Sequence, residues 1–192
     1  MRRACIVLAL LLGGFDPASA QDPKGNKPAS PRAPVTPTTT PRPRARIASR
    51  VYVGEPAPAF ELDASNGRAV RLGAQRGRWV LLVFDESRAA LVARRDLASE
   101  VGDLAITVLG VCNEKARTLQ TRASRDSVPF LLLADVTGEV SALYGLWDDE
   151  RDSTRPGFVL VDRDGFVRMA LLGSSLPVQD IARLVHFAVT GS

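Results

Sequence analysis

The sequence predicts a mixed α/β domain whose central sheet carries helices on both faces. Continuous apolar runs at 79–84, 105–111 and 128–133 have the length and hydrophobicity of strands that are covered on both sides. Helical patterns separate these runs, which favours right-handed crossovers onto a largely parallel sheet. A late hairpin at 158–172 then adds antiparallel strands at one edge.

The elements before the second central strand are predicted from residue 60 onward. Residues 60–63 and 69–72 are short strand-like segments on either side of Asn66-Gly67, a turn pair, and so predict a hairpin. After strand 79–84, the segment 86–101 has helical spacing, with Leu91, Leu97 and Val101 able to share one stripe. Gly102 is expected to end that helix.

The remaining elements alternate in the same way. Strand 105–111 precedes a polar helix at 114–125, and strand 128–133 precedes a short helix at 139–144. Residues 147–154 form a strongly acidic loop. Strands 158–161 and 166–172 flank the turn 163–165, and an amphipathic helix follows Pro177.

The first twenty residues have the pattern of a secretory signal peptide. Arg2 and Arg3 precede an apolar stretch from Ala4 to Phe15, and the segment ends in Ala18-Ser19-Ala20, a cleavage pattern. The apolar stretch is shorter than the roughly 20 residues of a membrane-spanning helix, so no membrane span is expected. We expect an extracytoplasmic protein, periplasmic or secreted, after cleavage near Ala20; an uncleaved anchor is the alternative.

Residues 21–50 predict a disordered linker between the signal peptide and a domain at 51–192. They hold seven prolines, and seven basic residues against the single acid Asp22. Such a segment has too few apolar side chains to offset the conformational entropy that it would lose on ordering. The linker either lies on an anionic envelope surface or is a solvated spacer. Residues 51–192 hold 16 basic and 19 acidic residues, a net charge of −3, which gives no reason to expect nucleic-acid binding.

Six short motifs occur in a fixed order along residues 51–190. They are Val53-Gly54-Glu55-Pro56-Ala57-Pro58-Ala59-Phe60-Glu61-Leu62, the segment Gly77 to Phe84, Val108-Leu109-Gly110-Val111, Val128-Pro129-Phe130, Ala134-Asp135 with Gly138-Glu139-Val140 and Tyr144-Gly145, and Val161-Asp162-Arg163-Asp164-Gly165. In this order they resemble the AhpC/TSA (peroxiredoxin-like) redoxin family of the thioredoxin-like superfamily. The resemblance implies a thioredoxin-like, peroxiredoxin-type fold, a family-level antioxidant activity, and relatives that often form homodimers.

The family's chemistry is carried by a P-x-x-x-T-x-x-C segment just after the first central strand. There the resemblance implies a thiolate at a helix start that attacks peroxide, with threonine orienting the peroxide and proline shielding the thiolate. Counted from Phe84, these three positions fall on Glu86, Ala90 and Ala93. No cysteine occurs between Cys5 and Cys112, so we expect a vestigial site that lacks the peroxidatic cysteine.

The family also places an arginine just before the strand that ends at Asp162. Arg155 lies close to that position, while Pro156 occupies the expected register. Pro156 resembles the cis-proline that thioredoxin and its relatives carry beside the active site. The alternative is an ordinary loop proline beside a solvated arginine.

Cys112 is the one cysteine outside the predicted signal peptide, so no internal disulfide is expected. It ends the second central strand, at the sheet edge where such folds bind ligands, and is therefore the one candidate for thiol chemistry. A cysteine at the end of an apolar strand can equally be a small buried hydrophobe. The sequence predicts no metal site and no cofactor, because no cluster of ligand-type residues or phosphate-binding loop occurs.

Two functions follow from these observations. In the first, the protein is a degenerate redoxin-fold module that binds a protein or envelope partner in a cleft beside Phe84, Cys112 and Arg155. In the second, it is a thiol-dependent peroxidase or oxidoreductase that uses Cys112 as a relocated nucleophile with an external reductant. Neither the partner nor the substrate is specified by the sequence.

Overall fold

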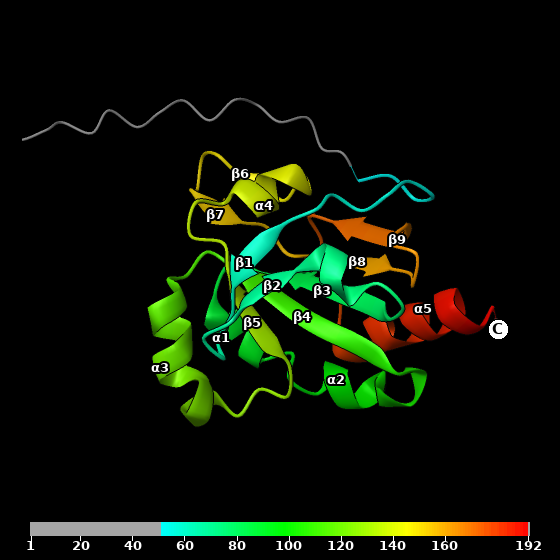
Figure 1. Ribbon diagram of the computed structural model, residues 1–192, viewed down its shortest axis with the longest axis horizontal. Coiled ribbons are helices and arrows are strands. Elements are labelled where there is room, and N and C mark those ends of the chain that lie inside the picture. The colour runs from blue at the N-terminus through cyan, green and yellow to red at the C-terminus, as the bar shows by residue number, and fades with distance from the viewer. Residues whose placement is uncertain (1–50, 192) are drawn as a thin grey trace, which may run out of the picture. The chain divides into compact units, whose positions relative to one another are not determined.

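The computed structural model describes residues 51–191 (Figure 1), so the predicted signal peptide and linker lie outside the described residues. The elements in chain order are β1 (Glu61–Asp63), β2 (Ala69–Arg71), η1 (Leu72–Gln75), β3 (Trp79–Phe84), α1 (Arg88–Val92), α2 (Leu97–Glu100), η2 (Gly102–Leu104), β4 (Ile106–Cys112), α3 (Ala116–Asp126), β5 (Leu131–Ala134), α4 (Glu139–Leu143), β6 (Trp147–Asp148), β7 (Ser153–Thr154), β8 (Gly157–Val161), β9 (Val167–Leu172) and α5 (Val178–Thr190). No helix among them is long and apolar enough to cross a membrane.

The central sheet has five strands in the order β5-β4-β3-β8-β9. Strands β3, β4 and β5 run parallel, whereas β8 pairs antiparallel with β3, and β9 pairs antiparallel with β8. The parallel strands are joined through helices and the antiparallel pair through a short turn, as their connections require. The predicted mixed sheet of the thioredoxin-like type is therefore confirmed.

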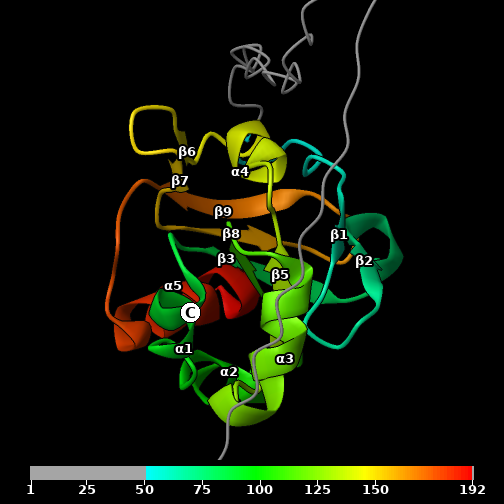
Figure 2. The ribbon, with the colours of Figure 1, turned by 90° about the vertical axis from the view of Figure 1, so that its left-hand side faces the viewer.

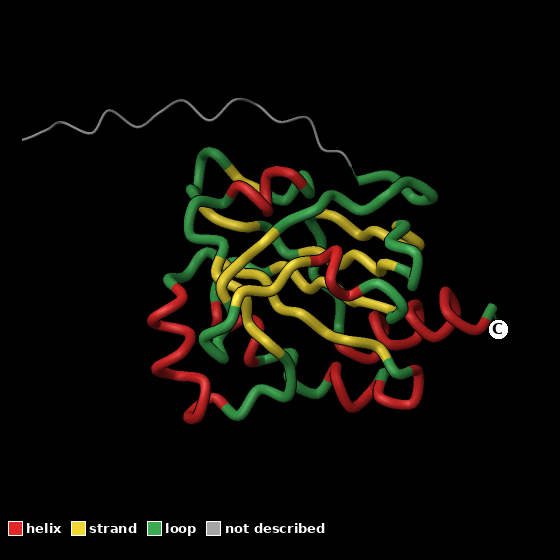
Figure 3. The backbone as a smooth tube through the Cα atoms, viewed as in Figure 1, coloured by secondary structure: helices red, strands yellow, loops and turns green. Residues whose placement is uncertain are grey.

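Two apolar cores lie on the two faces of this sheet, and strand β3 contributes to both. Val80, Leu82 and Phe84 belong to the core shared with the β1–β2 hairpin and α4, while Leu81 and Val83 belong to the core covered by α1, α2, α3 and α5. Successive side chains of a strand point to opposite faces, so a strand buried on both faces must be apolar throughout. Figures 2 and 3 show the larger helices gathered on one side of the sheet.

The helix predicted at 86–101 is instead two short helices, α1 and α2, separated by residues 93–96. Leu91 and Leu97 are both fully buried, yet six residues along a regular helix turn a side chain about 120° away from the first. The chain resolves this conflict with tight turns, in which the N–H of Arg94 donates to the Leu91 carbonyl and that of Leu97 to the Arg94 carbonyl, both at 3.0 Å. The single-helix prediction was wrong for this reason.

Two other predicted elements differ in detail. The third parallel strand begins at Leu131 rather than Val128, and Pro129, which has no N–H to donate, precedes it. The predicted acidic loop 147–154 is a small hairpin in which β6 and β7 pair, Trp147 with Thr154 and Asp148 with Ser153. Asp149, Glu150 and Asp152 occupy the turn between the two strands, whereas Asp148 belongs to β6.

Candidate functional site

An open cleft of about 680 Å³ lies at the carboxyl end of strand β3. Its walls come from the β3–α1 connection, from α1 and the turn after it, from the residue before β8, and from the segment that enters α5. The lining residues are Asp85, Glu86, Ala90, Ala93, Arg94, Asp96, Pro156, Ser175, Leu176, Pro177, Val178 and Gln179. The structure thus brings four of the five predicted vestigial positions, Glu86, Ala90, Ala93 and Pro156, to one cleft.

The single cation of the cleft, Arg94, is already bound by protein groups. Its Nε lies 2.8 Å from Oδ2 of Asp85, and both side chains are nearly buried, at 12% and 6% exposed. The guanidinium also donates to the Leu176 carbonyl at 3.0 Å and to Oγ of Ser175 at 2.7 Å, and its Cζ lies 5.4 Å from the centre of the Phe158 ring. Arg94 therefore fastens the segment before α5 to the end of β3.

Asp85 and Arg94 were not singled out by the sequence reasoning. A weak signal existed for Asp85, because it follows directly on a buried strand. The rim of the cleft also carries the carboxylates of Glu86 and Asp96, which are exposed. Ser87 caps the N-terminus of helix α1, because its Oγ accepts from the N–H of Ala90 at 3.2 Å.

Arg155 does not line the cleft, although Pro156 next to it does. The Arg155 side chain is exposed, and its Nη2 donates to the Gly145 carbonyl at 3.1 Å. Its backbone N–H donates to the Leu146 carbonyl at 2.6 Å. Arg155 thus joins the loop before β8 to the end of α4.

Cys112 is completely buried at the end of strand β4. It packs in the core beneath α1 and α3, and its carbonyl accepts the N–H groups of Glu114 at 2.9 Å and Asp135 at 3.0 Å. Burial, together with the Glu114 carboxylate, raises the pKa of the Cys112 thiol from 9.0 to about 12. Phe84 is likewise fully buried, so neither residue lines the cleft that was expected beside them.

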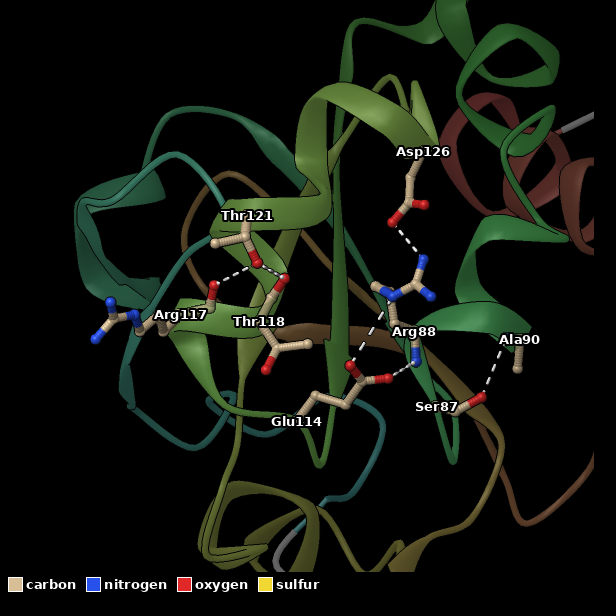
Figure 4. A network of polar contacts seen from close by, with 8 residues as sticks. All are labelled: Ser87, Arg88, Ala90, Glu114, Arg117, Thr118, Thr121 and Asp126. Carbon is tan, nitrogen blue, oxygen red and sulfur yellow. Dashed lines mark hydrogen bonds and ion pairs between the residues drawn. The ribbon is translucent and has the colours of Figure 1, made fainter. Parts of the chain in front are cut away.

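A polar network built on Arg88 joins the start of α1 to Glu114 and Asp126, which lie before and at the end of α3 (Figure 4). The backbone N–H of Arg88 donates to Oε1 of Glu114 at 2.9 Å, and its guanidinium pairs with Asp126 and lies 3.9 Å from Oε2 of Glu114. The carboxylates of Glu114 and Asp126 thus neutralise the charge of Arg88. The residual attraction of Arg88 for the thiolate lowers the Cys112 pKa less than burial and Glu114 raise it.

The residues described, 51–191, contain no group of three or more acidic, histidine or cysteine side chains placed to hold a metal ion.

A five-stranded mixed sheet of this order, with a cleft where β3 gives way to a helix, defines a thioredoxin-like protein of the peroxiredoxin type. The AhpC/TSA family profile matches residues 53–170. The chain belongs to the AhpC/TSA family.

Individual relatives agree with this assignment. The chain is 28% identical over 138 residues to "Putative peroxiredoxin in rubredoxin operon" of Clostridium pasteurianum, covering 62% of this chain and 78% of that one. It is 27% identical over 124 residues to Peroxiredoxin Bcp of Escherichia coli, covering 58% and 80%. The fold resembles the crystal structures of Peroxidoxin BcpB from Mycobacterium tuberculosis (TM-score 0.63, 18% identity, covering 73% and 97%) and AhpC from Enterococcus faecalis (0.64, 15%, covering 74% and 97%).

Proposed function

We propose that this protein is a degenerate AhpC/TSA-family member that has lost thiol peroxidase chemistry and works by binding a partner. The partner is a protein or an envelope component, and the binding surface is the cleft beside α1. The proposal places the protein outside the cytoplasm, on the strength of the signal-like pattern of residues 1–20.

The observation that carries the proposal is the mismatch between the cleft and the one described cysteine. Peroxide reduction needs an accessible thiolate of lowered pKa. Ala93, to which counting from Phe84 assigns the register of the family's nucleophile, lines the cleft, and an alanine methyl group cannot be oxidised by peroxide. Cys112 has a thiol, but it is fully buried and its pKa is raised to about 12.

The cleft keeps features that suit binding. Small and apolar side chains line it, among them Ala90, Ala93, Pro156 and Leu176, and exposed carboxylates stand at its rim. Concave sites with a few polar groups around an apolar lining are the usual places where proteins take ligands. The Asp85–Arg94 pair holds two walls of the cleft in fixed positions without leaving a cation free for an oxyanion.

A second candidate is a thiol-dependent peroxidase that uses Cys112, and the names of the peroxiredoxin relatives favour it. In that reaction the Cys112 thiolate attacks the peroxide O–O bond, forms a sulfenic acid and releases water or an alcohol. An external thiol then displaces water to give a mixed disulfide, and a second thiol regenerates Cys112. This route requires an opening motion that exposes the end of β4.

Peroxide consumption in the presence of a small thiol separates the two candidates. We expect solutions of the wild-type chain and of the Cys112→Ala variant to consume hydrogen peroxide at the same rate. That rate should equal the rate of the added small thiol without protein. A saturable, protein-dependent rate that Cys112→Ala abolishes would contradict the proposal and establish the second candidate.

The binding role is tested by placing a photo-crosslinking residue in the cleft. We expect probes at Ala93 and Gln179, both in the cleft, to give the same crosslinked product in producing cells. A probe at Arg183, an exposed position on α5, serves as the matched control. Equal products from all three positions, or none from the cleft positions, would count against a binding function there.

Limited proteolysis tests the proposed organisation. The proline-rich, basic segment 21–50 should be cut first, because it lacks the apolar residues of a core. A resistant fragment that begins near Val51 is the expected product. Equal resistance of residues 21–50 would show the boundary to be wrong.

A further inference from the structure

Two carboxylates in the cleft beside α1 have no cation to balance them. Glu86 and Asp96 line the cleft, one before α1 in the chain and one after it, and both are exposed. Neither pairs with a basic side chain among residues 51–191. The third carboxylate of the lining, Asp85, is paired with Arg94. The lining therefore holds three carboxylates and one guanidinium, a balance of −2.

The guanidinium of Arg94 cannot turn toward these two carboxylates without breaking contacts that hold the walls of the cleft. Its Nε binds Asp85, its Nη1 donates to the Leu176 carbonyl at 3.0 Å, and its Nη2 donates to Oγ of Ser175 at 2.7 Å. Each of its three nitrogens is thus engaged. The neighbouring Arg95 is exposed and is not among the residues that line the cleft. The two exposed carboxylates are therefore available to a ligand that brings its own positive charge.

Small and apolar side chains make up most of the rest of the lining. Ala90 and Ala93 come from α1 and the turn that follows it, and Pro156, Leu176 and Val178 come from the residue before β8 and the segment that enters α5. The volume of about 680 Å³ suits a few side chains rather than a folded domain. An occupant can therefore insert an apolar side chain close to the groups that carry its positive charge.

We propose that this cleft binds a basic segment of a partner protein, whose Lys or Arg side chains pair with Glu86 and Asp96 while an apolar side chain packs on Ala90 and Ala93. This assignment rests on the proposed function, in which the cleft is the binding surface, and adds the chemistry of the partner. An acidic segment would bring like charges beside the two carboxylates, which disfavours its binding. A polyamine would meet the carboxylates but leave the apolar side chains uncovered. A basic peptide segment with apolar residues matches both features of the lining.

Selection from a phage-displayed library of random dodecapeptides tests the charge of the occupant without assuming its sequence. The full-length wild-type chain is the target, and the Ala93→Trp variant serves for counter-selection, because the two chains differ only in the cleft. Ala93 is exposed and has the backbone angles of a right-handed helix, φ −63° and ψ −16°, so the introduced indole occupies the cleft rather than the core. We expect the recovered peptides to be enriched in Lys and Arg next to apolar residues.

The synthetic consensus peptide of that selection is then titrated against variants of the two carboxylates. Glu86→Gln and Asp96→Asn should each weaken binding about threefold, because each removes one partly exposed ion pair. The Asp96 side chain makes no capping hydrogen bond to α2, so its neutralisation leaves that helix unchanged. Glu100→Gln, at an exposed position of α2 outside the lining, is the matched control and should not change the affinity. Added salt should weaken the wild-type complex more than the complexes of the two variants.

Enrichment of acidic or uncharged peptides that the Ala93→Trp variant does not bind would overturn the basic partner but leave the cleft a binding surface. Basic peptides that bind both carboxylate variants as tightly as the wild-type chain would overturn it too. Displacement of the consensus peptide by an equal concentration of spermidine would overturn it in favour of a polyamine. Selection of no peptide would also overturn it, and crosslinking at Ala93 and Gln179 would then decide separately whether the cleft binds any partner.

Discussion

The cleft beside α1 and the core around Cys112 divide between them what a thiol peroxidase must combine. The cleft is open, but Ala93 stands at the position that counting from Phe84 assigns to the family's nucleophile, and Arg94 is engaged by Asp85. Cys112 supplies sulfur, but it is fully buried beneath α1 and α3, and its pKa is raised. The accessible cleft, which has no thiol, lies at the end of β3. The inaccessible thiol of Cys112 lies at the end of the adjacent strand β4.

On the proposed function, the difference teaches that a family fold can persist without its reaction. The features that match the AhpC/TSA family serve the sheet and its turns, which need apolar strands and specific turn residues whatever the chemistry. Asp85 pairs with Arg94, and Asp126 pairs with Arg88, so both cations are already engaged by carboxylates.

The largest expected effect is a difference in alkylation rate between the two regions. At neutral pH, Cys112 in the folded chain should react about 1000-fold or more slowly than in urea, because a thiol with pKa about 12 rather than 9.0 has that much less thiolate. An Ala93→Cys variant should gain a second thiol that reacts as an ordinary exposed one, since Ala93 is exposed. Comparable rates at Cys112 and at the introduced cysteine would break the comparison.

The next effect concerns the ion pair that fastens the cleft. Arg94→Met should lower the free energy of unfolding by about 3 kcal/mol, because it leaves the nearly buried Asp85 carboxylate without its partner. Arg95→Met, at the exposed neighbouring position, is the matched control and should change stability by less than about 0.5 kcal/mol. Urea denaturation of both variants measures the difference, and similar values for the two would show that Arg94 is dispensable.

The smallest effect is a pH-dependent difference in the free energy of unfolding between the wild-type chain and Cys112→Ala. At pH 7 the loss of a buried sulfhydryl should cost about 1 kcal/mol. Above pH 9 the unfolded thiol ionises while the folded one stays protonated, so the wild-type chain loses stability as the pH rises toward 12. By pH 10.5 this loss is about 2 kcal/mol, and Cys112→Ala should be the more stable protein.

Denaturation curves at pH 7 and pH 10.5 test that reversal. Because only the thiol differs between the two proteins, the titration of lysines, tyrosines and arginines cancels in the comparison. A constant difference between the two proteins across this range would mean that the Cys112 pKa is not raised by folding.

Much of the fold was predictable because it depends on local patterns. The continuous apolar segments gave β3 and β4 nearly to the residue, and the turn residues at 163–165 marked the β8–β9 hairpin. The break between α1 and α2 was missed because it satisfies two distant demands, the burial of both leucines, Leu91 and Leu97, and the contact of Arg94 with Asp85. The periodicity of a short sequence segment does not indicate such contacts between distant residues.

The candidate site was predictable in part for the same reason. Counting from Phe84 located Glu86, Ala90 and Ala93, and the cleft holds all three. The roles of Asp85, Arg94 and Arg88 depend on which charged groups the fold brings within hydrogen-bonding distance, and for Arg88 the partner Asp126 lies 38 residues away. The burial of Cys112 follows the preference of cysteine for strand ends inside a core.

The most direct test of the central claim is the oxidation state of Cys112 after exposure of the folded, full-length chain to hydrogen peroxide. Mass spectrometry with a sulfenic-acid trapping reagent reports whether a peroxide oxygen has been transferred to that sulfur. The account predicts that Cys112 stays a free thiol at peroxide concentrations that oxidise the exposed thiol of Ala93→Cys. Rapid, stoichiometric trapping of sulfenic acid at Cys112 in the wild-type chain would contradict it and make this protein a peroxidase with a relocated nucleophile.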